Sequence, residues 1–354
     1  MTKNLKYRLM FALLLTACVL LSCRPTDEPK PSPQPDPEPE KPFFAKGADI
    51  SWATEMEAKG YKFYNAAGEE RECTALMKEL GFNAVRYRVW VNPTNGYNSK
   101  KEVLVKALRA KNLGMKVMID FHYSDSWADP GKQYKPEAWA DLSLADLMDA
   151  VVEHTRETLS LLKANGVDVA WIQIGNEVDN GMLWETCRVK DQSASAFVQC
   201  FNAAAAAAKG VFPEAQIVMH IGNGWDTNVS NWFFDLMKTN GANYDIIGLS
   251  LYPSYWQNGA YPDWKSKTQA SVKNVSMLHI RYGCPVMIVE VGMPAAEPDN
   301  AKEMLQYLFD STKDLDFFSG IFYWEPESEH SRNGYDYGAF VGGKPTQALD
   351  PFQE

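Results

Sequence analysis

Two glutamates end two apolar runs of this chain. The first run, Ile172 to Glu177, reads I-Q-I-G-N-E, and the second, Val286 to Glu290, reads V-M-I-V-E. Gly292 and Pro294 follow the second run, and proline cannot prolong a helix or a central strand. A carboxylate at the end of a buried strand faces a site and not a core. The two glutamates therefore predict one shared active site.

Paired carboxylates at such a position most simply perform glycoside hydrolysis. One carboxyl group protonates the leaving oxygen, while the other attacks the anomeric carbon or activates a water molecule. A separation of about 5 to 5.5 Å indicates retention through a covalent intermediate, and roughly 6.5 to 9.5 Å indicates inversion. The sequence does not give this separation.

Each glutamate has a structural alternative. Glu177 could be a surface loop residue, but Asn176 beside it supplies an amide that can hold a sugar hydroxyl, and the flanking residues are apolar. Glu290 could form a structural ion pair with Arg86. Such a pair is compatible with catalysis, because a neighbouring arginine favours the ionised form that a nucleophile requires.

Eight short β-rich runs alternate with amphipathic stretches along the chain. We expect strands at Ala45 to Ile50, Ala84 to Val89, Met115 to Phe121, Val169 to Ile174, Gln216 to Ile221, Ile246 to Leu251, Val286 to Val291 and Gly320 to Trp324. Helical patterns between them include Glu70 to Leu80, Val103 to Asn112, Leu144 to Ala164, Ala194 to Lys209 and Ala301 to Thr312.

This alternation implies a parallel sheet with right-handed crossovers. Eight repeats favour a closed (β/α)8 TIM barrel over an open doubly wound sheet, and no G-x-G-x-x-G follows a strand to support a dinucleotide site. In such a barrel the carboxyl ends of all strands converge on one face, where the active site lies. Glu177 follows the fourth strand and Glu290 ends the seventh, so both belong to that face.

Polar and aromatic side chains gather at the other strand ends. A single histidine or tryptophan there is more often structural, but their clustering favours carbohydrate binding, because sugar rings offer C–H faces to stack and hydroxyls to bind. The residues concerned are Asp49, Arg86, Arg88, Trp90, Asp120, His122, Ser124, His220, Asn223, Trp225, Tyr252, Tyr255 and Trp324. Glu325, Glu327 and Glu329 are further carboxylates near the rim, which we assign to loop structure or distal subsites.

The N-terminus predicts export. Lys3, Lys6 and Arg8 precede the apolar run Met10 to Leu21, which is too short for a stable membrane span, so residues 1–22 read as a signal peptide. The run ends in L-L-S-C at Cys23, which resembles the bacterial lipobox, in which the cysteine is lipidated. The alternative is a chance cysteine in an ordinary signal. Residues 23–42 then form a Pro-rich acidic linker that cannot pack a core. We expect the protein to be lipid-anchored in the bacterial cell envelope, at the outer-membrane surface or the periplasmic face.

Composition leaves residues 43–354 as one catalytic domain, within the size range of a single barrel. The formal net charge of -10 becomes -13 without the signal peptide, which argues against nucleic acid as a partner. The remaining cysteines have no C-x-x-C spacing typical of zinc sites. Cys187 and Cys200 could form a disulfide. Nothing in the sequence indicates an oligomer, so we expect a monomer.

Several segments resemble the arabinogalactan endo-β-1,4-galactanases of glycoside hydrolase family 53. The resemblance covers nearly the whole chain from Phe43 to Phe352, and the R-V-W-V-N-P and D-F-H-Y-S-D-S-W-A-D-P segments are highly specific. Its motifs are G-A-D-I-S at Gly47 to Ser51, N-A-V-R-Y-R-V-W-V-N-P at Asn83 to Pro93, D-F-H-Y-S-D-S-W-A-D-P at Asp120 to Pro130, I-G-N-E at Ile174 to Glu177, G-L-S-L-Y-P at Gly248 to Pro253 and F-Y-W-E-P at Phe322 to Pro326.

The resemblance implies a retaining enzyme that cleaves β-1,4-galactan, with Glu177 as the acid/base and Glu290 as the nucleophile. Arg86 and Asn176 would hold the nucleophile and the sugar 2-hydroxyl, and Tyr252 would bond to the nucleophile. Residues implied to line the catalytic subsite are His122, His220 and Trp324. Asp49, Trp90, Asp120 and Trp127 also fall in matching motifs, although Asp120 and Trp127 could merely brace the loop after the third strand.

The chain departs from some bacterial relatives after the seventh strand. Those relatives carry a long calcium-binding loop, whereas here only Met293 to Pro298 separate Glu290 from the next helix. We therefore expect no metal and no cofactor. Two other functions stay open: a β-mannanase or β-glucanase of the same clan, which would lack the R-V-W-V-N-P segment, and a lipid-anchored glycan-binding protein without turnover, which need not retain both carboxylates.

Overall fold

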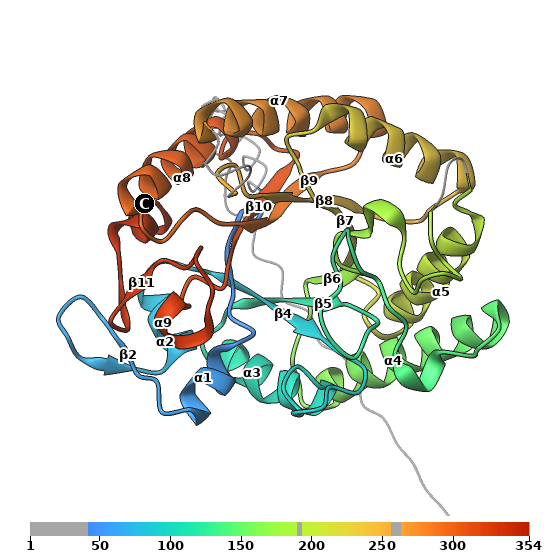
Figure 1. The fold of residues 1–354 in the computed structure, drawn as a ribbon, viewed down its shortest axis with the longest axis horizontal. Helices are drawn as coiled ribbons and strands as arrows, with labels where there is room; N and C mark the ends of the chain where they lie inside the picture. The colour runs from blue at the N-terminus through green and yellow to red at the C-terminus, as the bar shows by residue number, and fades with distance from the viewer. Residues whose placement is uncertain (1–41, 190–192, 256–262, 354) are drawn as a thin grey trace, which may run out of the picture. The chain divides into compact units, whose positions relative to one another are not determined.

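Eight parallel strands close into a barrel in the computed structural model (Figure 1). The structure describes residues 42–189, 193–255 and 263–353, so the predicted signal peptide, Cys23 and nearly all of the linker lie outside the described residues. The barrel strands are β1 (Ala45–Asp49), β4 (Ala84–Val89), β5 (Lys116–Phe121), β6 (Trp171–Ile174), β7 (Gln216–Ile221), β8 (Ile246–Leu251), β9 (Val286–Val291) and β10 (Phe318–Trp324). Each pairs with its neighbour in sequence, and β1 closes the circle by pairing with both β4 and β10.

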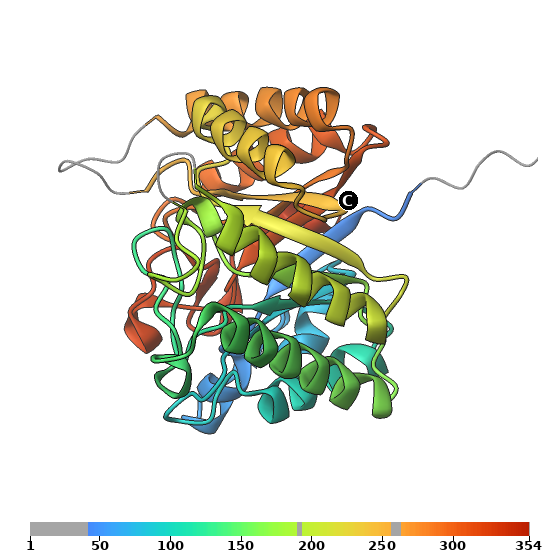
Figure 2. The ribbon, with the colours of Figure 1, turned by 90° about the vertical axis from the view of Figure 1, so that its right-hand side faces the viewer.

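Helices surround the strands on the outside (Figure 2). They are α1 (Ala53–Ala58), α2 (Cys73–Glu79), α3 (Lys100–Asn112), α4 (Leu144–Ala164), α5 (Ser195–Val211), α6 (Thr227–Asn240), α7 (Trp264–Tyr282), α8 (Pro298–Thr312) and the short α9 (His330–Asn333). Short 3-10 helices are η1 (Glu137–Trp139), η2 (Val178–Asn180) and η3 (Gln347–Phe352), and small hairpins join β2 (Phe63–Tyr64) to β3 (Glu70–Arg71) and β11 (Phe340–Val341) to β12 (Lys344–Pro345).

The predicted (β/α)8 barrel is confirmed, and every predicted strand is present within two residues of its expected limits. The helix expected from Glu70 begins only at Cys73, because Glu70 and Arg71 pair with β2 as a hairpin. The side chain of Glu72 then caps α2 by accepting hydrogen bonds from two backbone N–H groups of the first turn, which the helix itself leaves unpaired.

Two apolar layers hold the barrel together. A large cluster fills the space between strands and helices, and a smaller one fills the interior near the amino ends of the strands, where Trp171 packs edge-on against Phe322. Gly47 is required here, because a Cβ atom at that position would come within 2.1 Å of the Phe322 ring. The interior is therefore a packed core, and only its carboxyl-end layer is polar.

Alternation along each strand produces this polar layer. On β4, Ala84 belongs to the interior cluster, and Arg86, two residues on, reaches the polar side chains above it. Strand β9 departs from this alternation. Val289 belongs to the interior cluster, and the next residue, Glu290, also reaches the interior polar groups. The pairing of β8 with β9 shifts register between Leu249 and Ser250, and such an irregularity allows two successive side chains to face inward.

Among the described residues, no helix combines the length and apolar character needed to cross a membrane. The same residues contain no cluster of three or more histidine, cysteine, aspartate or glutamate side chains suited to a metal ion.

Candidate active site

Left-handed backbone marks the carboxyl ends of four barrel strands. Tyr123 after β5, Glu177 after β6, Asn223 after β7 and Glu325 after β10 have φ values between 45° and 51°. Residues other than glycine rarely adopt this conformation, and where the surrounding structure enforces it, functional sites are common. The sharp turns stop each strand where its side chains enter the polar layer.

Arg86 is the centre of this layer. Its guanidinium is fully buried and forms ion pairs with Asp49 at 2.7 Å, Asp120 at 2.9 Å and Glu290 at 2.9 Å. Its Nε donates to Gln173 at 3.1 Å. One cation therefore links strands β1, β4, β5, β6 and β9, and it fixes the position of the Glu290 carboxyl group.

Glu290 is 95% buried and is held at both oxygens. Arg86 contacts Oε1, and the Tyr252 hydroxyl donates to Oε2 at 2.9 Å. Burial raises the pKa of Glu290 and outweighs Arg86 and the Tyr252 hydrogen bond, which lower it, so the resulting pKa is about 7. The two donors thus favour the ionised form that nucleophilic attack requires.

Asn176 and His220 connect Arg86 to the turn that bears Glu177. The Asn176 amide oxygen accepts from Arg86 at 3.0 Å, and its Nδ2 donates to the Ala128 carbonyl at 2.8 Å. Burial lowers the pKa of His220 well below its ordinary value, so the ring is neutral. Its Nδ1 lies 3.3 Å from the backbone N–H of Glu177 and 3.1 Å from Nε2 of Gln173, and both groups are donors.

These contacts favour one tautomer of His220. Besides the two donors, Nδ1 lies 3.1 Å from the Asn176 amide oxygen, which already accepts from Arg86. We therefore assign Nδ1 as the acceptor of the two donors and place the proton on Nε2. The Nε2–H group then donates to the Ser250 hydroxyl, 2.8 Å away. This leaves the hydroxyl hydrogen of Ser250 available for another acceptor, and the Ser250 hydroxyl interacts with the Glu177 carboxyl group.

Glu177 has the higher proton affinity of the two glutamates. Burial, Glu290 and Asp179 raise the pKa of Glu177 well above its ordinary value, while the Ser250 hydroxyl lowers it. On loss of the first proton from the pair, Glu290 therefore becomes ionised while Glu177 stays protonated. Two carboxyl groups whose environments separate their pKa values in this order fit an acid and a nucleophile.

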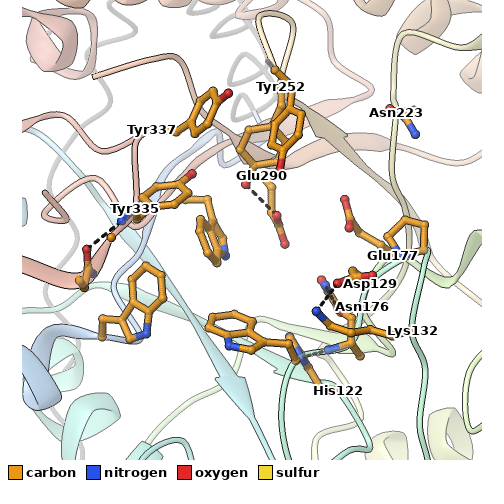
Figure 3. A pocket seen from close by; sticks show the side chains of 18 of the residues that line it. His122, Asp129, Lys132, Asn176, Glu177, Asn223, Tyr252, Glu290, Tyr335 and Tyr337 are labelled. Atoms are coloured by element: carbon orange, nitrogen blue, oxygen red, sulfur yellow. Dashed lines mark hydrogen bonds and ion pairs between the residues drawn. The ribbon is translucent and has the colours of Figure 1, made fainter. Parts of the chain in front are cut away.

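A cleft of about 680 Å³ lies over these groups. Both glutamates line it, and Figure 3 shows Tyr335 and Tyr337 on one side of Glu290, with Glu177 and Lys132 on the other. The cleft combines aromatic faces with carboxylate, amide and ammonium groups, and its volume lies in the range typical of ligand sites.

The structure divides the predicted site residues into two groups. Those that line the cleft are Glu177, Glu290, Asn176, His122, Tyr252, Trp324 and Trp127. Those that lie beneath it and hold the lining residues are Arg86, Asp49, Asp120, Trp90 and His220. His220, expected in the lining, is fully buried and reaches the cleft only through its partners. Trp127, expected as a possible brace, is exposed to the cleft.

The His122 ring shows how the buried group supports the lining. Its Nε2 contacts Asp120 at 2.9 Å, and its Nδ1 accepts hydrogen bonds from the Trp90 indole N–H and the Ala128 backbone N–H, both at 3.3 Å. The ring is therefore fixed from both nitrogens. Asp120 therefore holds two lining groups: it contacts His122 directly, and it contacts Arg86, which in turn holds Glu290.

Several residues of the site were absent from the prediction. Gln173 and Ser250 are single polar residues inside apolar strands, and this interruption was a readable signal. Trp52, Lys132, Tyr335 and Tyr337 come from loops, for which strand-end reasoning gave no signal. Of the three rim glutamates, Glu325 and Glu327 are fully buried outside the cleft lining, and Glu329 accepts hydrogen bonds from the backbone of Gly342 and Gly343, which is loop structure.

The chain is similar to known proteins over most of its length. The model of glycosyl hydrolase family 53 matches residues 45–349. A probable arabinogalactan endo-β-1,4-galactanase A from Aspergillus fumigatus is 33% identical, with 79% of this chain and 83% of that relative covered. An arabinogalactan endo-β-1,4-galactanase from Humicola insolens is 28% identical, with 81% and 91% covered.

Solved structures give the same grouping. A structure of fungal β-1,4-galactanases superposes with a TM-score of 0.77 at 27% identity, over 87% of this chain and 98% of that one. A family 53 catalytic domain from Ignisphaera aggregans superposes with a TM-score of 0.73 at 26% identity, over 90% and 97%.

Proposed function

Since the chain belongs to glycoside hydrolase family 53, we propose that it is an arabinogalactan endo-β-1,4-galactanase that cleaves β-1,4-galactosidic bonds within galactan chains. Its relatives named as galactanases align over about four fifths of this chain. The observation that carries the proposal is the glutamate pair in one cleft, because both groups that glycoside hydrolysis needs are present and differ in proton affinity.

The reaction we propose is a double displacement with retention. The Glu290 carboxylate attacks the anomeric carbon, and Glu177 transfers its proton to the departing glycosidic oxygen. Glu177, now ionised, removes a proton from a water molecule that attacks the galactosyl–Glu290 ester, and Glu290 leaves as a carboxylate. The contacts of Glu290 with Arg86 and Tyr252 support its role, because both donors stabilise the leaving and attacking carboxylate.

The first test is release of reducing sugar from linear β-1,4-galactan, with β-mannan and cellulose alongside, by residues 43–354. We expect activity on galactan alone. Glu177→Ala and Glu290→Ala should each lower it by roughly 10³-fold or more, because each removes one of two catalytic groups that act together. Activity on mannan or cellulose would contradict the assignment of galactan as the substrate and favour a β-mannanase or β-glucanase. Binding of galactan without release would make the protein a glycan-binding protein.

Azide separates the two roles. With an aryl β-galactoside that has a good leaving group, Glu177→Ala plus azide should give the β-galactosyl azide, because the intermediate still forms on Glu290. Glu290→Ala plus azide should give the α-galactosyl azide by direct displacement. The opposite pair of products would exchange the roles, and an initial α product from the unmodified enzyme would show inversion instead of retention.

We further propose that Cys23 carries a lipid that anchors a monomeric enzyme in the bacterial cell envelope. The support is the sequence alone, namely the lipobox-like L-L-S-C and the Pro-rich segment that follows. Metabolic labelling with an alkyne fatty acid should mark the full-length chain and not its Cys23→Ser variant. Labelling of both, or of neither, would contradict the anchor.

A further inference from the structure

Arg88 is a buried cation that the proposed reaction does not use. It lies on β4, two residues beyond Arg86, and is 1% exposed. One end of its guanidinium, NH1, pairs with Glu325 after β10. Its Nε and NH2 groups have no hydrogen-bond partner among the described residues. A buried arginine with unpaired N–H groups is unfavourable unless something else attracts it.

Indole rings supply that attraction. The guanidinium carbon lies 4.4 Å from the ring centre of Trp127, 5.1 Å from that of Trp52 and 5.6 Å from that of Trp90. Trp324 is at 6.0 Å. All four lie within the range of cation–π attraction, which is stronger when the cation is removed from water. The guanidinium, two of whose nitrogens lack hydrogen bonds, is therefore surrounded by aromatic rings.

Three of these indoles form one surface with Tyr335. Trp52, Trp127, Trp324 and Tyr335 all line the cleft, and we call them the aromatic wall. Their rings meet edge to face, with centroids 5.5 Å apart for Trp52 and Trp127, 5.3 Å for Trp52 and Trp324, and 4.7 Å for Trp324 and Tyr335. Arg88 is absent from the cleft lining, so the wall separates its guanidinium from any substrate.

Tyr335, one member of the wall, lies on the glycone side of the proposed cleavage point. The acid must stand beside the departing oxygen, so the leaving part of the galactan lies on the side of Glu177. Figure 3 shows Tyr335 across Glu290 from Glu177. The galactosyl units that become attached to the nucleophile then lie on the side of Tyr335, whose ring contacts the indoles of Trp52 and Trp324. This step rests on the proposed function.

We propose that Arg88 is a positioning residue for substrate binding, which holds the indoles of Trp127 and Trp52 in the arrangement that binds the glycone-side galactosyl units. Glu325 fixes the guanidinium, and the same carboxyl group accepts the Trp52 backbone N–H at 3.1 Å. The Glu325 backbone N–H in turn donates to the Asp49 carbonyl at 2.8 Å. Glu325 thus connects Arg88 with Trp52 and with Asp49, the partner of Arg86. Arg88 itself does not touch the sugar.

The test compares Arg88→Met with the unmodified enzyme on linear galactan. Methionine fills much of the space but lacks the charge and the planar fork, so the indoles lose their common partner. We expect KM to rise roughly tenfold while kcat changes by less than about threefold, because the reacting groups keep their contacts. Near-ultraviolet circular dichroism should lose the signal of the coupled indoles at a temperature where the variant is fully folded.

Arg88→Lys keeps the charge beside Glu325 and guards against misfolding of the methionine variant. Lysine lacks the planar group that stacks on several rings, so we expect it to keep the elevated KM. The matched control is Arg109→Met, which removes an arginine that pairs with Glu57 and Glu72 away from the cleft. Its KM and its aromatic circular dichroism should equal those of the unmodified enzyme.

A double-mutant cycle decides whether Arg88 acts through the wall. If it does, Trp127→Ala alone should raise KM, and adding Arg88→Met should raise it little further. Independent effects that multiply would overturn the proposal, as would a lowered melting temperature of Arg88→Met with unchanged KM. Failure of the unmodified enzyme on galactan would instead contradict the proposed function, so the two failures are distinguishable.

Discussion

The proton affinity of Glu290 is set by a few contacts that act in opposite directions. Burial and the nearby carboxylates of Asp120 and Asp49 raise its pKa, Arg86 and the Tyr252 hydroxyl lower it, and the resulting pKa is about 7. A nucleophile must be ionised, so activity should be lost as the pH falls through this pKa. The acid limb of kcat/KM, which reports the free enzyme, is therefore expected near pH 7.

Tyr252→Phe tests this assignment. The phenol donates a hydrogen bond that stabilises the ionised carboxylate, so its removal should raise the pKa of Glu290 further. We expect the acid limb of kcat/KM to move up by about one pH unit, the size of a hydrogen bond to a charged group. Tyr307→Phe, at an exposed position on α8, is the control. An unchanged acid limb would remove Tyr252 from this role.

Ser250 should act on the other limb. Its hydroxyl lowers the pKa of Glu177, and the Nε2–H tautomer of His220 leaves the hydroxyl hydrogen directed away from the histidine. Ser250→Ala should therefore move the basic limb of the pH profile to higher pH, because Glu177 keeps its proton longer. The control is Ser271→Ala, which removes a buried serine hydroxyl on α7, away from Ser250 on β8. It should leave both limbs of the pH profile in place. A downward shift in Ser250→Ala would contradict the tautomer.

Strand β9 shows where prediction from sequence reaches its limit at the scale of the element. Its apolar run and the glutamate at its end identified a strand and a site residue. Strict alternation from Val289 would have turned Glu290 toward the helices, and only the register shift against β8 brings it inward. That shift depends on pairing between distant segments, which no local pattern records.

The other elements divide in the same way. Polar residues such as His122 and Tyr252 were identified because each directly follows an apolar run, where a change of residue type is visible in the sequence. Trp52, Tyr335 and Tyr337 were not, because they lie in connections whose paths are fixed by packing and not by periodicity. The helices α6 and α7 were also absent from the predicted patterns, although α7 carries Lys267, which lines the cleft.

The loop after β6 offers a prediction about an element. Cys187 in this loop and Cys200 on α5 place their sulfur atoms 3.0 Å apart, and both side chains are fully buried. Closing this gap by about 1 Å gives a disulfide bond length. If the chain is exported as proposed, we expect the pair to be oxidised, which would tie the loop that follows Glu177 to α5.

Intact mass without reductant should then be lower by the two hydrogens lost on oxidation, and only Cys73 and Cys284 should react with iodoacetamide in the unfolded domain. The bond closes a short loop, so Cys200→Ser should lower the free energy of unfolding by up to about 3 kcal/mol. Cys284→Ser is the control, since that residue stands apart from the pair. Alkylation of all four thiols would contradict the prediction.

At the scale of the whole molecule, the folded site retains a proton on Glu177 that the unfolded chain would lose at neutral pH, and this lowers the stability of the fold. The pKa of Glu177 is raised well above its ordinary value in the folded state, whereas in the unfolded chain it has the ordinary value of 4.5. Above pH 4.5 the unfolded state therefore releases this proton more readily than the folded state does. The group favours unfolding at neutral pH, and this penalty disappears as the pH falls below 4.5.

Glu177→Gln should consequently stabilise the fold while it removes activity. The amide keeps the shape but cannot ionise, so we expect the free energy of unfolding at pH 7 to rise by about 1 to 2 kcal/mol, typical of relief at a strained site. Thermal unfolding from pH 4 to pH 8 measures it. The gain should be largest at high pH and vanish near pH 4, and the exposed Glu214→Gln should show no gain at any pH. A gain independent of pH would mean that packing and not ionisation causes it. A loss of stability at pH 7 would show that the native Glu177 side chain stabilises the fold, and would contradict this prediction.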